Sequence, residues 1–359
     1  MNIRHELLDK SQRKQLPDTR DLGFGILRTN HMFVADYTDG AWKNARIVPY
    51  GPFPLMPGAM VLHYGQAIFE GIKAFLHPDK ELYVFRPEMN FLRLNHSAGI
   101  VQMPHIPPEL SMEGLLRLLD VERDWCPTLP ESSLYIRPLV FGDADMIGVK
   151  PSPSYTYCIM LSPCGPYYPG GFSSPLRLLI TEKFHRAVSG GTGTAKTGGN
   201  YAASLRPAEY AHSRKCNQVL YLDASNQYLE EAGTMNHYHV MKDGTFVIPA
   251  FNDSVLHSIT SQSVLDLAAL GHIRARTEQI RIDTFLKQLQ SGEIIEAGGF
   301  GTAAVVSPVG SYLLDNGMEI TVNDGKIGPH SRRLYELYSA MQTGGRAAPE
   351  GWLVKVPRY

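Results

Sequence analysis

The chain has little cysteine and no excess of charge of either sign. Among 359 residues there are 4 cysteines, and the 34 basic residues nearly balance the 35 acidic ones. The cysteines form no Cys-x-x-Cys pair and show no metal-ligand spacing, so neither a zinc site nor a disulfide framework is predicted. The balanced charge provides no field that would attract nucleic acid or a membrane surface. We therefore expect a small-molecule partner.

Long apolar runs and metal-binding histidine motifs are also missing. No apolar run approaches the roughly 20 residues that a membrane-spanning helix requires. Residues 1–21 are polar and mixed in charge, without the apolar core of a signal peptide, which predicts a cytoplasmic protein. His-Glu-x-x-His does not occur, although His237 and His239 alternate along a predicted strand and so share one side of it. Such a pair can bind a metal but more often marks a polar sheet face, and no metal site is predicted.

The pattern of apolar residues predicts a mixed α/β protein of two domains. Strands are expected at residues 82–85, 134–141, 155–161, 176–182, 218–223, 237–241 and 246–248, and helices at 112–123, 260–270, 282–290 and 330–341. Lys242-Asp243-Gly244-Thr245 predicts a hairpin turn. Residues 162–172 contain three prolines and cannot continue a regular element, so we place an interdomain loop there, between domains of residues 1–161 and 173–359.

Lys196 is the first candidate for chemistry. It stands in a stretch of glycine and small residues, from Ser189 to Tyr201, without an acidic neighbour in sequence. A lysine amine in such a setting can react with a carbonyl compound, and flanking glycines let a cofactor approach the backbone. Pyridoxal phosphate is the carbonyl cofactor to consider. The simpler alternative is a surface lysine in a flexible loop.

Three further segments fit a pyridoxal phosphate site. Glu231 precedes a short turn between two predicted strands, so its carboxylate can point inward toward a pyridinium nitrogen. Residues 298–304 predict a glycine-rich turn whose backbone N–H groups and hydroxyl could hold a phosphate. Ser258-Ile259-Thr260 lies at the start of a predicted helix, where an anion is favoured.

Taken in order along the chain, these motifs resemble those of the branched-chain-amino-acid aminotransferases, pyridoxal phosphate enzymes of fold type IV. The matching blocks are Leu62 to Gly71, Arg93-Leu94 with Ser97-Ala98, Tyr135-Ile136-Arg137-Pro138, Lys196 to Tyr201, Glu231 to Asn236, and Gly301-Thr302-Ala303-Ala304. The resemblance implies a smaller N-terminal α/β domain, a larger C-terminal barrel-like domain and a homodimer. It also implies ping-pong transfer of an amino group from L-leucine, L-isoleucine or L-valine to 2-oxoglutarate.

The resemblance assigns roles to individual residues. Lys196 would form the Schiff base with the cofactor and shuttle the proton, Glu231 would face the pyridine nitrogen, and Tyr201 would donate to the phenolic oxygen. The residues implied to hold the phosphate are Arg93, Arg186, Ile259, Thr260 and Thr302. Tyr135 and Arg137 would bind the substrate carboxylate, helped by the turn Thr302-Ala303-Ala304. The residues implied to form the apolar side-chain pocket are Phe24, Tyr64, Phe69, Val149 and Tyr167, with Tyr64 and Val149 reaching across from the partner subunit.

Without the resemblance, several of these residues have simpler interpretations. Arg93 on a helical pattern would ordinarily be a surface residue, and Tyr64, Phe69 and Tyr201 would ordinarily pack in the core. Arg137 is different because it interrupts an apolar strand, and a charge is rarely buried there without a partner or ligand.

The chain departs from the family pattern at three places. His257-Ser258 replaces the usual Pro-Gly before the phosphate-binding turn, His237-Tyr238-His239 replaces apolar residues, and Pro207 interrupts the helix that follows Tyr201. Two other functions also remain: a fold type IV enzyme that acts on D-amino acids or as an amine lyase, and a protein that binds pyridoxal phosphate without catalysis.

Overall fold

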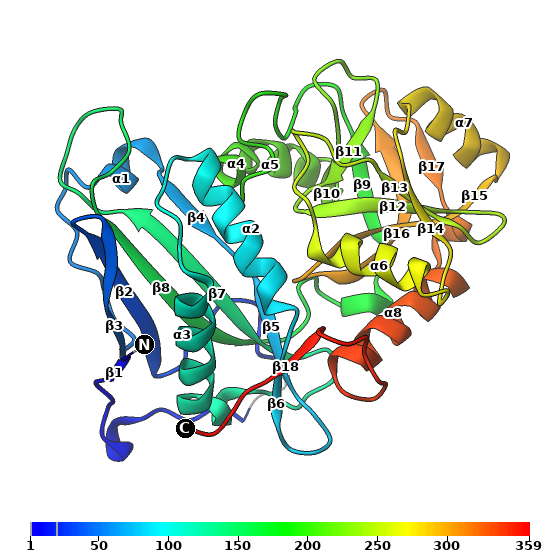
Figure 1. The fold of residues 1–359 in the computed structure, drawn as a ribbon. Helices are drawn as coiled ribbons and strands as arrows, with labels where there is room; N and C mark the ends of the chain where they lie inside the picture. The colour runs from blue at the N-terminus through cyan, green and yellow to red at the C-terminus, as the bar shows by residue number, and fades with distance from the viewer. Residues whose placement is uncertain (1, 19–20) are drawn as a thin grey trace. The chain divides into compact units, whose positions relative to one another are not determined.

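A computed structural model of the protein describes residues 2–18 and 21–359 (Figure 1). Residues 1, 19 and 20, which fall within the first predicted domain, lie outside the described residues. The chain forms two compact units. Unit 1 contains the residues up to Tyr167 with Ala195–Gly198 and Ala340–Tyr359, and unit 2 contains Tyr168–Thr194 and Gly199–Ser339. These units differ from the predicted domains because two later segments of the chain join unit 1.

Unit 1 is built on one sheet with the strand order β1-β3-β2-β8-β7-β5-β6-β18, and β4 pairs with β7 beside this path. Its strands are β1 (Arg4–His5), β2 (His31–Thr38), β3 (Ala41–Pro49), β4 (Ala67–Phe69), β5 (Ile72–Leu76), β6 (Leu82–Phe85), β7 (Ser133–Gly142), β8 (Tyr155–Cys164) and β18 (Leu353–Lys355). The three strands predicted in this part of the chain, at 82–85, 134–141 and 155–161, are confirmed.

The helices of unit 1 pack on this sheet, and Figure 1 shows α2 and α3 in front of its strands. They are η1 (Lys10–Gln12), α1 (Met60–Tyr64), α2 (Pro87–Ile100), α3 (Pro108–Val121) and η2 (Arg123–Trp125). The helix predicted at 112–123 is α3, which begins four residues earlier because proline is tolerated in the first turn, where no N–H is needed. Its residues Leu115, Leu118 and Leu119 are fully buried in the core of unit 1.

Strand β8 runs three residues beyond its predicted end, into the segment that we expected to be loop. Pro163 has no N–H to donate, which made a strand end plausible. The last residue of β8 that pairs with β2 is Ile159, whereas pairing with β7 continues to Cys164. At Pro163, β8 therefore pairs with a neighbouring strand on one side only. Proline is tolerated there because its missing N–H can face the unpaired side.

Unit 2 is built around a closed ring of strands. The order β11-β10-β9-β16-β15-β12 returns to its start because β12 also pairs with β11, which makes this part barrel-like as predicted. The strands of unit 2 are β9 (Leu176–Ile180), β10 (Gln218–Leu222), β11 (Leu229–Ala232), β12 (Met235–Met241), β13 (Phe246–Pro249), β14 (Ala275–Glu278), β15 (Ile294–Gly301), β16 (Val305–Leu314) and β17 (Glu319–Thr321). The hairpin predicted at residues 242–245 joins β12 to β13.

Three of the helices of unit 2, at residues 259–269, 282–291 and 329–342, confirm the helices predicted from periodicity, whereas those at 198–203 and 205–213 were not predicted. The helices of this unit are η3 (Gly171–Ser173), α4 (Gly198–Ala203), α5 (Leu205–Ser213), α6 (Ile259–Ala269), α7 (Ile282–Ser291), η4 (Asn323–Gly325) and α8 (Pro329–Gln342), the last of which ends in unit 1. The interruption expected from Pro207 is found: α4 ends at Ala203, and Pro207 occupies the first turn of α5, where its missing N–H is harmless.

The histidine pair of β12 does not lie on a polar sheet face, and that interpretation was wrong. His237 and His239 are 0% and 2% exposed, and both rings contact Phe285 of α7. Alternation predicted correctly that the two side chains share one face, but it could not predict that α7 covers this face. In the described part of the chain, no group of three or more His, Cys, Asp or Glu residues is arranged to hold a metal ion.

Among the described residues, no helix is both long enough and apolar enough to span a membrane.

Candidate active site

The backbone around Lys196 is held firmly within unit 1. The Lys196 carbonyl accepts from the Phe69 N–H at 3.0 Å, and the Lys196 N–H donates to Ser97 Oγ of α2 at 2.9 Å. Thr197 forms a bridge to Ile68 and donates its hydroxyl to the Ala67 carbonyl at 2.7 Å. The alternative of a surface lysine in a flexible loop is therefore wrong. The segment that carries Lys196 is attached to β4 and α2.

The Lys196 ammonium lies near an aromatic ring and a buried carboxylate. Its Nζ atom is 5.1 Å from the centre of the Phe69 ring. The adjacent Glu70 is fully buried. Burial alone would raise the pKa of Glu70, but the Arg93 guanidinium, with smaller contributions from Lys196 and Asn90, outweighs burial and lowers this pKa below its usual value. Glu70 is thus an anion that pairs with Arg93, and Lys196 is a weaker electrostatic neighbour.

Arg93 is a partly buried, ion-paired residue of α2 rather than a freely solvated surface residue. Its Nε and Nη2 atoms donate to the two oxygens of Glu70 at 2.6 and 2.8 Å, and its side chain is 10% exposed. Asn90, one turn earlier, donates to the same carboxylate at 2.8 Å. Two parallel bonds of this kind fix the plane of the guanidinium. A phosphate contact of Arg93 stays a prediction.

Tyr135 and Arg137 lie on the same side of β7, as their spacing requires. Arg137 Nη2 donates to the Tyr135 hydroxyl at 3.1 Å, and the guanidinium carbon is 4.8 Å from the centre of the Phe69 ring. The buried Arg137 Nε has no hydrogen-bond partner among the described residues. Gly71 makes this arrangement possible, because a Cβ atom there would lie 2.1 Å from the Tyr135 hydroxyl.

The predicted pocket residues divide into two groups. Phe24 contacts the rings of both Tyr135 and Tyr167, with 5.0 Å between ring centres in each pair. These three residues form an aromatic cluster of unit 1, and the Arg137 guanidinium, which lies over the rings of both Tyr135 and Phe69, connects Phe69 to it. Tyr64 and Val149 lie outside that cluster and are 39% and 88% exposed.

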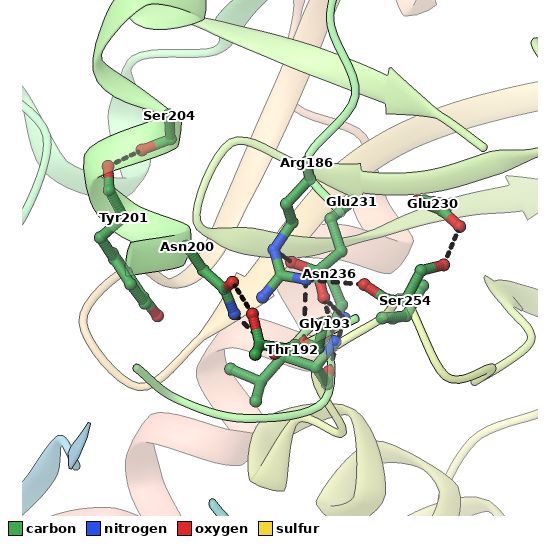
Figure 2. A network of polar contacts seen from close by, with 12 residues as sticks. Arg186, Thr192, Gly193, Asn200, Tyr201, Ser204, Glu230, Glu231, Asn236 and Ser254 are labelled. Carbon is green, nitrogen blue, oxygen red and sulfur yellow. Dashed lines mark hydrogen bonds and ion pairs between the residues drawn. The ribbon is translucent and has the colours of Figure 1, made fainter. Parts of the chain in front are cut away.

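Glu231 lies on β11 of unit 2, and its side chain is buried, as the prediction of an inward-pointing carboxylate requires. Its oxygens accept from Arg186 Nε at 2.7 Å, the Leu256 N–H at 2.5 Å and Asn236 Nδ2 at 3.5 Å (Figure 2). The carboxylate is 3% exposed.

Tyr201 lies close to Glu231. Residues Arg186, Asn200, Tyr201, Ser204, Glu231, Gly233 and Thr234 line one small pocket of unit 2. Figure 2 shows Tyr201 on α4, on the same side of the network as Asn200. The structure thus brings together two of the three residues predicted to have catalytic roles, whereas Lys196 belongs to unit 1.

The predicted phosphate-binding segments are only partly as expected. Ser258 caps α6 by accepting the Ser261 N–H, so the helix start is kept although His257-Ser258 replaces Pro-Gly. The N–H groups of Ile259 and Thr260 lie in the first turn, where helix donors have no partner within the helix. The glycine-rich turn is shorter than predicted, because residues 298–301 belong to β15 and pair with β16. Only Thr302, Ala303 and Ala304 form the turn.

The sequence analysis missed several residues that hold these groups. Glu70, Ser97, Asn236 and Leu256 all bond directly to a candidate residue, and Arg186 pairs with Glu231 rather than standing alone. Glu70 and Asn236 lie inside the matched blocks, so their position was a usable signal. The backbone donor of Leu256 leaves no trace in sequence.

The chain is similar to known proteins over most of its length. The family model for amino-transferase class IV matches residues 67–312. The chain is 44% identical over 345 residues to branched-chain-amino-acid transaminase 1 of Bacillus subtilis, with 96% of each chain covered. Its fold is similar to that of the Escherichia coli branched-chain amino acid aminotransferase, with a TM-score of 0.74, 25% identity and coverage of 91% and 99% of the two chains. A T.th. enzyme of the same name, solved with N-(5'-phosphopyridoxyl)-L-glutamate, has a TM-score of 0.70, 27% identity and coverage of 90% and 98%.

The matched segment includes every candidate residue except Phe24 and Tyr64, and the relatives are covered almost completely. The chain belongs to the class IV aminotransferases.

Proposed function

We propose that this chain is a branched-chain-amino-acid aminotransferase that moves the amino group of L-leucine, L-isoleucine or L-valine to 2-oxoglutarate. The single observation that carries the proposal is the buried Glu231 carboxylate, held by Arg186 and the Leu256 N–H beside Tyr201. A buried anion in this position could hold the proton of a pyridinium ring nitrogen. The relatives support the choice of amino acid by their names, and one of them binds a phosphopyridoxyl-glutamate conjugate.

The residues of the chain fit pyridoxal 5'-phosphate, the cofactor that we propose. Glu231 can hold the proton on the pyridine nitrogen, and Tyr201 can donate to the phenolic oxygen. The first turn of α6, with Ile259 and Thr260, offers backbone donors to a phosphate. Arg93 and Thr302 are the further phosphate ligands that we propose, whereas Arg186, which pairs with Glu231, would stand beside the ring nitrogen instead of the phosphate. When bound, the cofactor acts as an electron sink for the carbanion at the substrate α-carbon.

The chain supplies the proton transfers and the orientation. Lys196 would hold the cofactor through its amine, and the free amine would remove the substrate α-proton as a general base. The anchored backbone of Lys196 limits where its Nζ atom can reach. Because the same lysine returns the proton at a neighbouring carbon, one amine serves both transfers.

The substrate would be held at its carboxylate and at its side chain. Tyr135 and Arg137 provide a hydroxyl and a cation for the carboxylate, together with the turn Thr302-Ala303-Ala304. Phe24, Phe69 and Tyr167 provide an apolar wall for a branched side chain. Since 2-oxoglutarate must enter the same site in the second half of the ping-pong cycle, Arg137 also offers charge to its carboxylates.

We also propose a homodimer. Met56, Leu62, Tyr64, Ile147 and Val149 are exposed apolar residues, and the bridge between Ala59 and Asp145 joins the two segments that carry them. An exposed apolar surface of this kind is typical of a protein contact. In the dimer, Tyr64 and Val149 would complete the partner's pocket. A cytoplasmic location is proposed as well, supported by four buried thiols that are all free.

The test is reduction of the purified protein with borohydride, followed by peptide mass spectrometry. We expect the phosphopyridoxyl mass on Lys196, and loss of both this label and turnover in Lys196→Ala. Lys326→Ala, which changes an exposed lysine, should keep both. A label on another lysine would contradict the site, and faster turnover of D-alanine than of L-leucine would contradict the substrate in favour of a D-amino-acid enzyme. Cofactor binding without turnover of any amine would leave only a binding protein.

A further inference from the structure

Two consecutive glutamates of β11 are buried, and the proposed function uses only one of them. Glu230 and Glu231 are 2% and 3% exposed. Successive residues of a strand point to opposite sides, so the two carboxylates lie in different surroundings. A buried carboxylate is destabilising unless it is hydrogen-bonded, which makes the partners of Glu230 informative.

Both glutamates bond to the same segment, residues 252–256. Glu231 accepts from the Leu256 N–H at 2.5 Å. Glu230 Oε1 accepts a short hydrogen bond from Ser254 Oγ and a second from Asn252 Nδ2 at 3.2 Å (Figure 2). This segment is therefore fixed at two points by neighbouring residues of one strand.

Ser254 connects Glu230 to the rest of the site. Its carbonyl accepts from Arg186 Nη1 at 2.7 Å, and Arg186 in turn pairs with Glu231. Its backbone also packs directly on Gly193, where a Cβ atom would lie 2.4 Å from the Ser254 Cα. Figure 2 shows Arg186 between Glu231 and the loop of Thr192 and Gly193. A displacement of Ser254 would therefore also move Arg186 and the loop of Thr192 and Gly193.

The segment also leads into the proposed phosphate site. Two residues after Leu256 the chain reaches Ser258, the cap of α6, and then Ile259 and Thr260. The position of residues 252–256 consequently sets the spacing between Glu231, at one end of the cofactor, and the first turn of α6, at the other.

We propose that Glu230 is a positioning residue of the cofactor site, which acts through Ser254 to hold Arg186 and the start of α6 in register with Glu231. The inference rests on the proposed function. Only Oε1 of Glu230 makes these bonds, because the buried Oε2 has no partner among the described residues. The role therefore requires a hydrogen-bond acceptor and not a charge, and a glutamine can replace the glutamate.

The experiment measures the dissociation constant of pyridoxal phosphate from apoprotein by absorbance titration. Glu230→Ala removes the buried acceptor that Ser254 Oγ and Asn252 Nδ2 share, so that Ser254 Oγ keeps only Asn252 Oδ1, and we expect affinity to fall roughly ten- to a hundred-fold. Glu230→Gln should stay within about three-fold of the unmodified protein, and Ser254→Ala should weaken binding in the same direction as Glu230→Ala. The KM for L-leucine at saturating cofactor should not change.

Glu296→Ala is the matched control. Glu296 is another buried glutamate of unit 2, which accepts two backbone N–H groups at the start of α8. This variant should lower the melting temperature without changing cofactor affinity.

Unchanged affinity in Glu230→Ala, with only a lower melting temperature, would overturn the inference. Equal losses in Glu230→Gln and Glu230→Ala would also overturn it, because a charge would then be required. If Glu230→Ala does not fold, Ser254→Ala decides by the same criterion. An unmodified apoprotein that binds no pyridoxal phosphate would instead refute the proposed function.

Discussion

The buried histidines of β12 predict a steep loss of stability in mild acid. Burial, with a smaller contribution from the charge of Arg276, lowers the pKa of His239 to about 3 from an ordinary value of 6.5. Burial, together with the neighbouring His239, lowers the pKa of His237 well below its ordinary value. His237 has one ring nitrogen bonded to the Tyr312 hydroxyl at 2.8 Å, while Nδ1 of each histidine has no partner among the described residues.

The folded and the unfolded chain bind protons at these histidines at different pH values, and this difference makes the free energy of unfolding depend on pH. As the pH falls below 6.5, the unfolded chain binds a proton at each histidine, whereas folded His239 stays neutral down to about pH 3. The unfolded state is therefore favoured progressively, and stability that is present above pH 6.5 is lost as the pH falls through this window. Between pH 7 and pH 5 His239 contributes a loss of about 2 kcal/mol, and His237 adds a loss of the same sign.

The perturbation is His239→Leu, which keeps an apolar group of similar size and removes the titration. The free energy of unfolding should then depend less on pH, by about 2 kcal/mol between pH 7 and pH 5. All three tryptophans, Trp42, Trp125 and Trp352, belong to unit 1, so their fluorescence does not report on β12. Hydrogen exchange of the β12 amides measures the free energy of opening of unit 2 directly. The variants are compared with the unmodified protein at the same pH, because the intrinsic exchange rate itself depends on pH.

His212→Leu is the control, because His212 lies on α5 of the same unit with half of its side chain exposed. It should retain the pH dependence of the unmodified protein. The reasoning is refuted if His239→Leu and the unmodified protein lose the same protection between pH 7 and pH 5.

Two further predictions concern the proposed site. Arg137→Ala should raise the KM for L-leucine, L-isoleucine and L-valine together, by roughly ten- to a hundred-fold, because the carboxylate is common to all three substrates. Arg46→Ala is the control and should leave these KM values unchanged. An effect on glutamate and 2-oxoglutarate alone would mean that Arg137 contacts the substrate side chain and not the shared carboxylate. Gly193→Ala should weaken pyridoxal phosphate binding and lower the melting temperature, because its Cβ would lie 2.4 Å from the Ser254 Cα, whereas Gly199→Ala meets no atom within 4 Å. Titration and thermal unfolding of both glycine variants measure this, and equal behaviour would contradict the close contact.

The sequence was most informative where local chemistry alone decides the structure. The strand at residues 82–85, the hairpin at 242–245 and the helices at 282–290 and 330–341 follow from apolar periodicity and turn residues, and each is found with small shifts at its ends. Motif order also selected Lys196, Tyr201 and Glu231 as candidates. These features depend on near neighbours in the chain, which a sequence displays directly.

The glycine-rich end of β15 shows where local chemistry failed. Gly298, Gly299 and Gly301 predicted a turn, yet they pair with β16 because a strand is decided by its partners across the sheet. A Cβ at Gly298 would lie 2.3 Å from the Tyr238 hydroxyl, so the missing side chain accommodates a ring of β12. Composition cannot separate a glycine that permits a turn from one that permits such packing.

The surroundings of the candidate residues were likewise decided by tertiary structure. The sequence determined that Lys196 stands in a glycine-rich stretch, but the long-range bonds to Phe69 and Ser97 attach it to unit 1. It determined that Glu231 precedes a turn, but the N–H of Leu256, 25 residues later, holds its carboxylate. The physical reason is the same in both cases: residue type fixes which chemistry a side chain can perform, whereas burial and hydrogen-bond partners come from segments that only folding brings into contact.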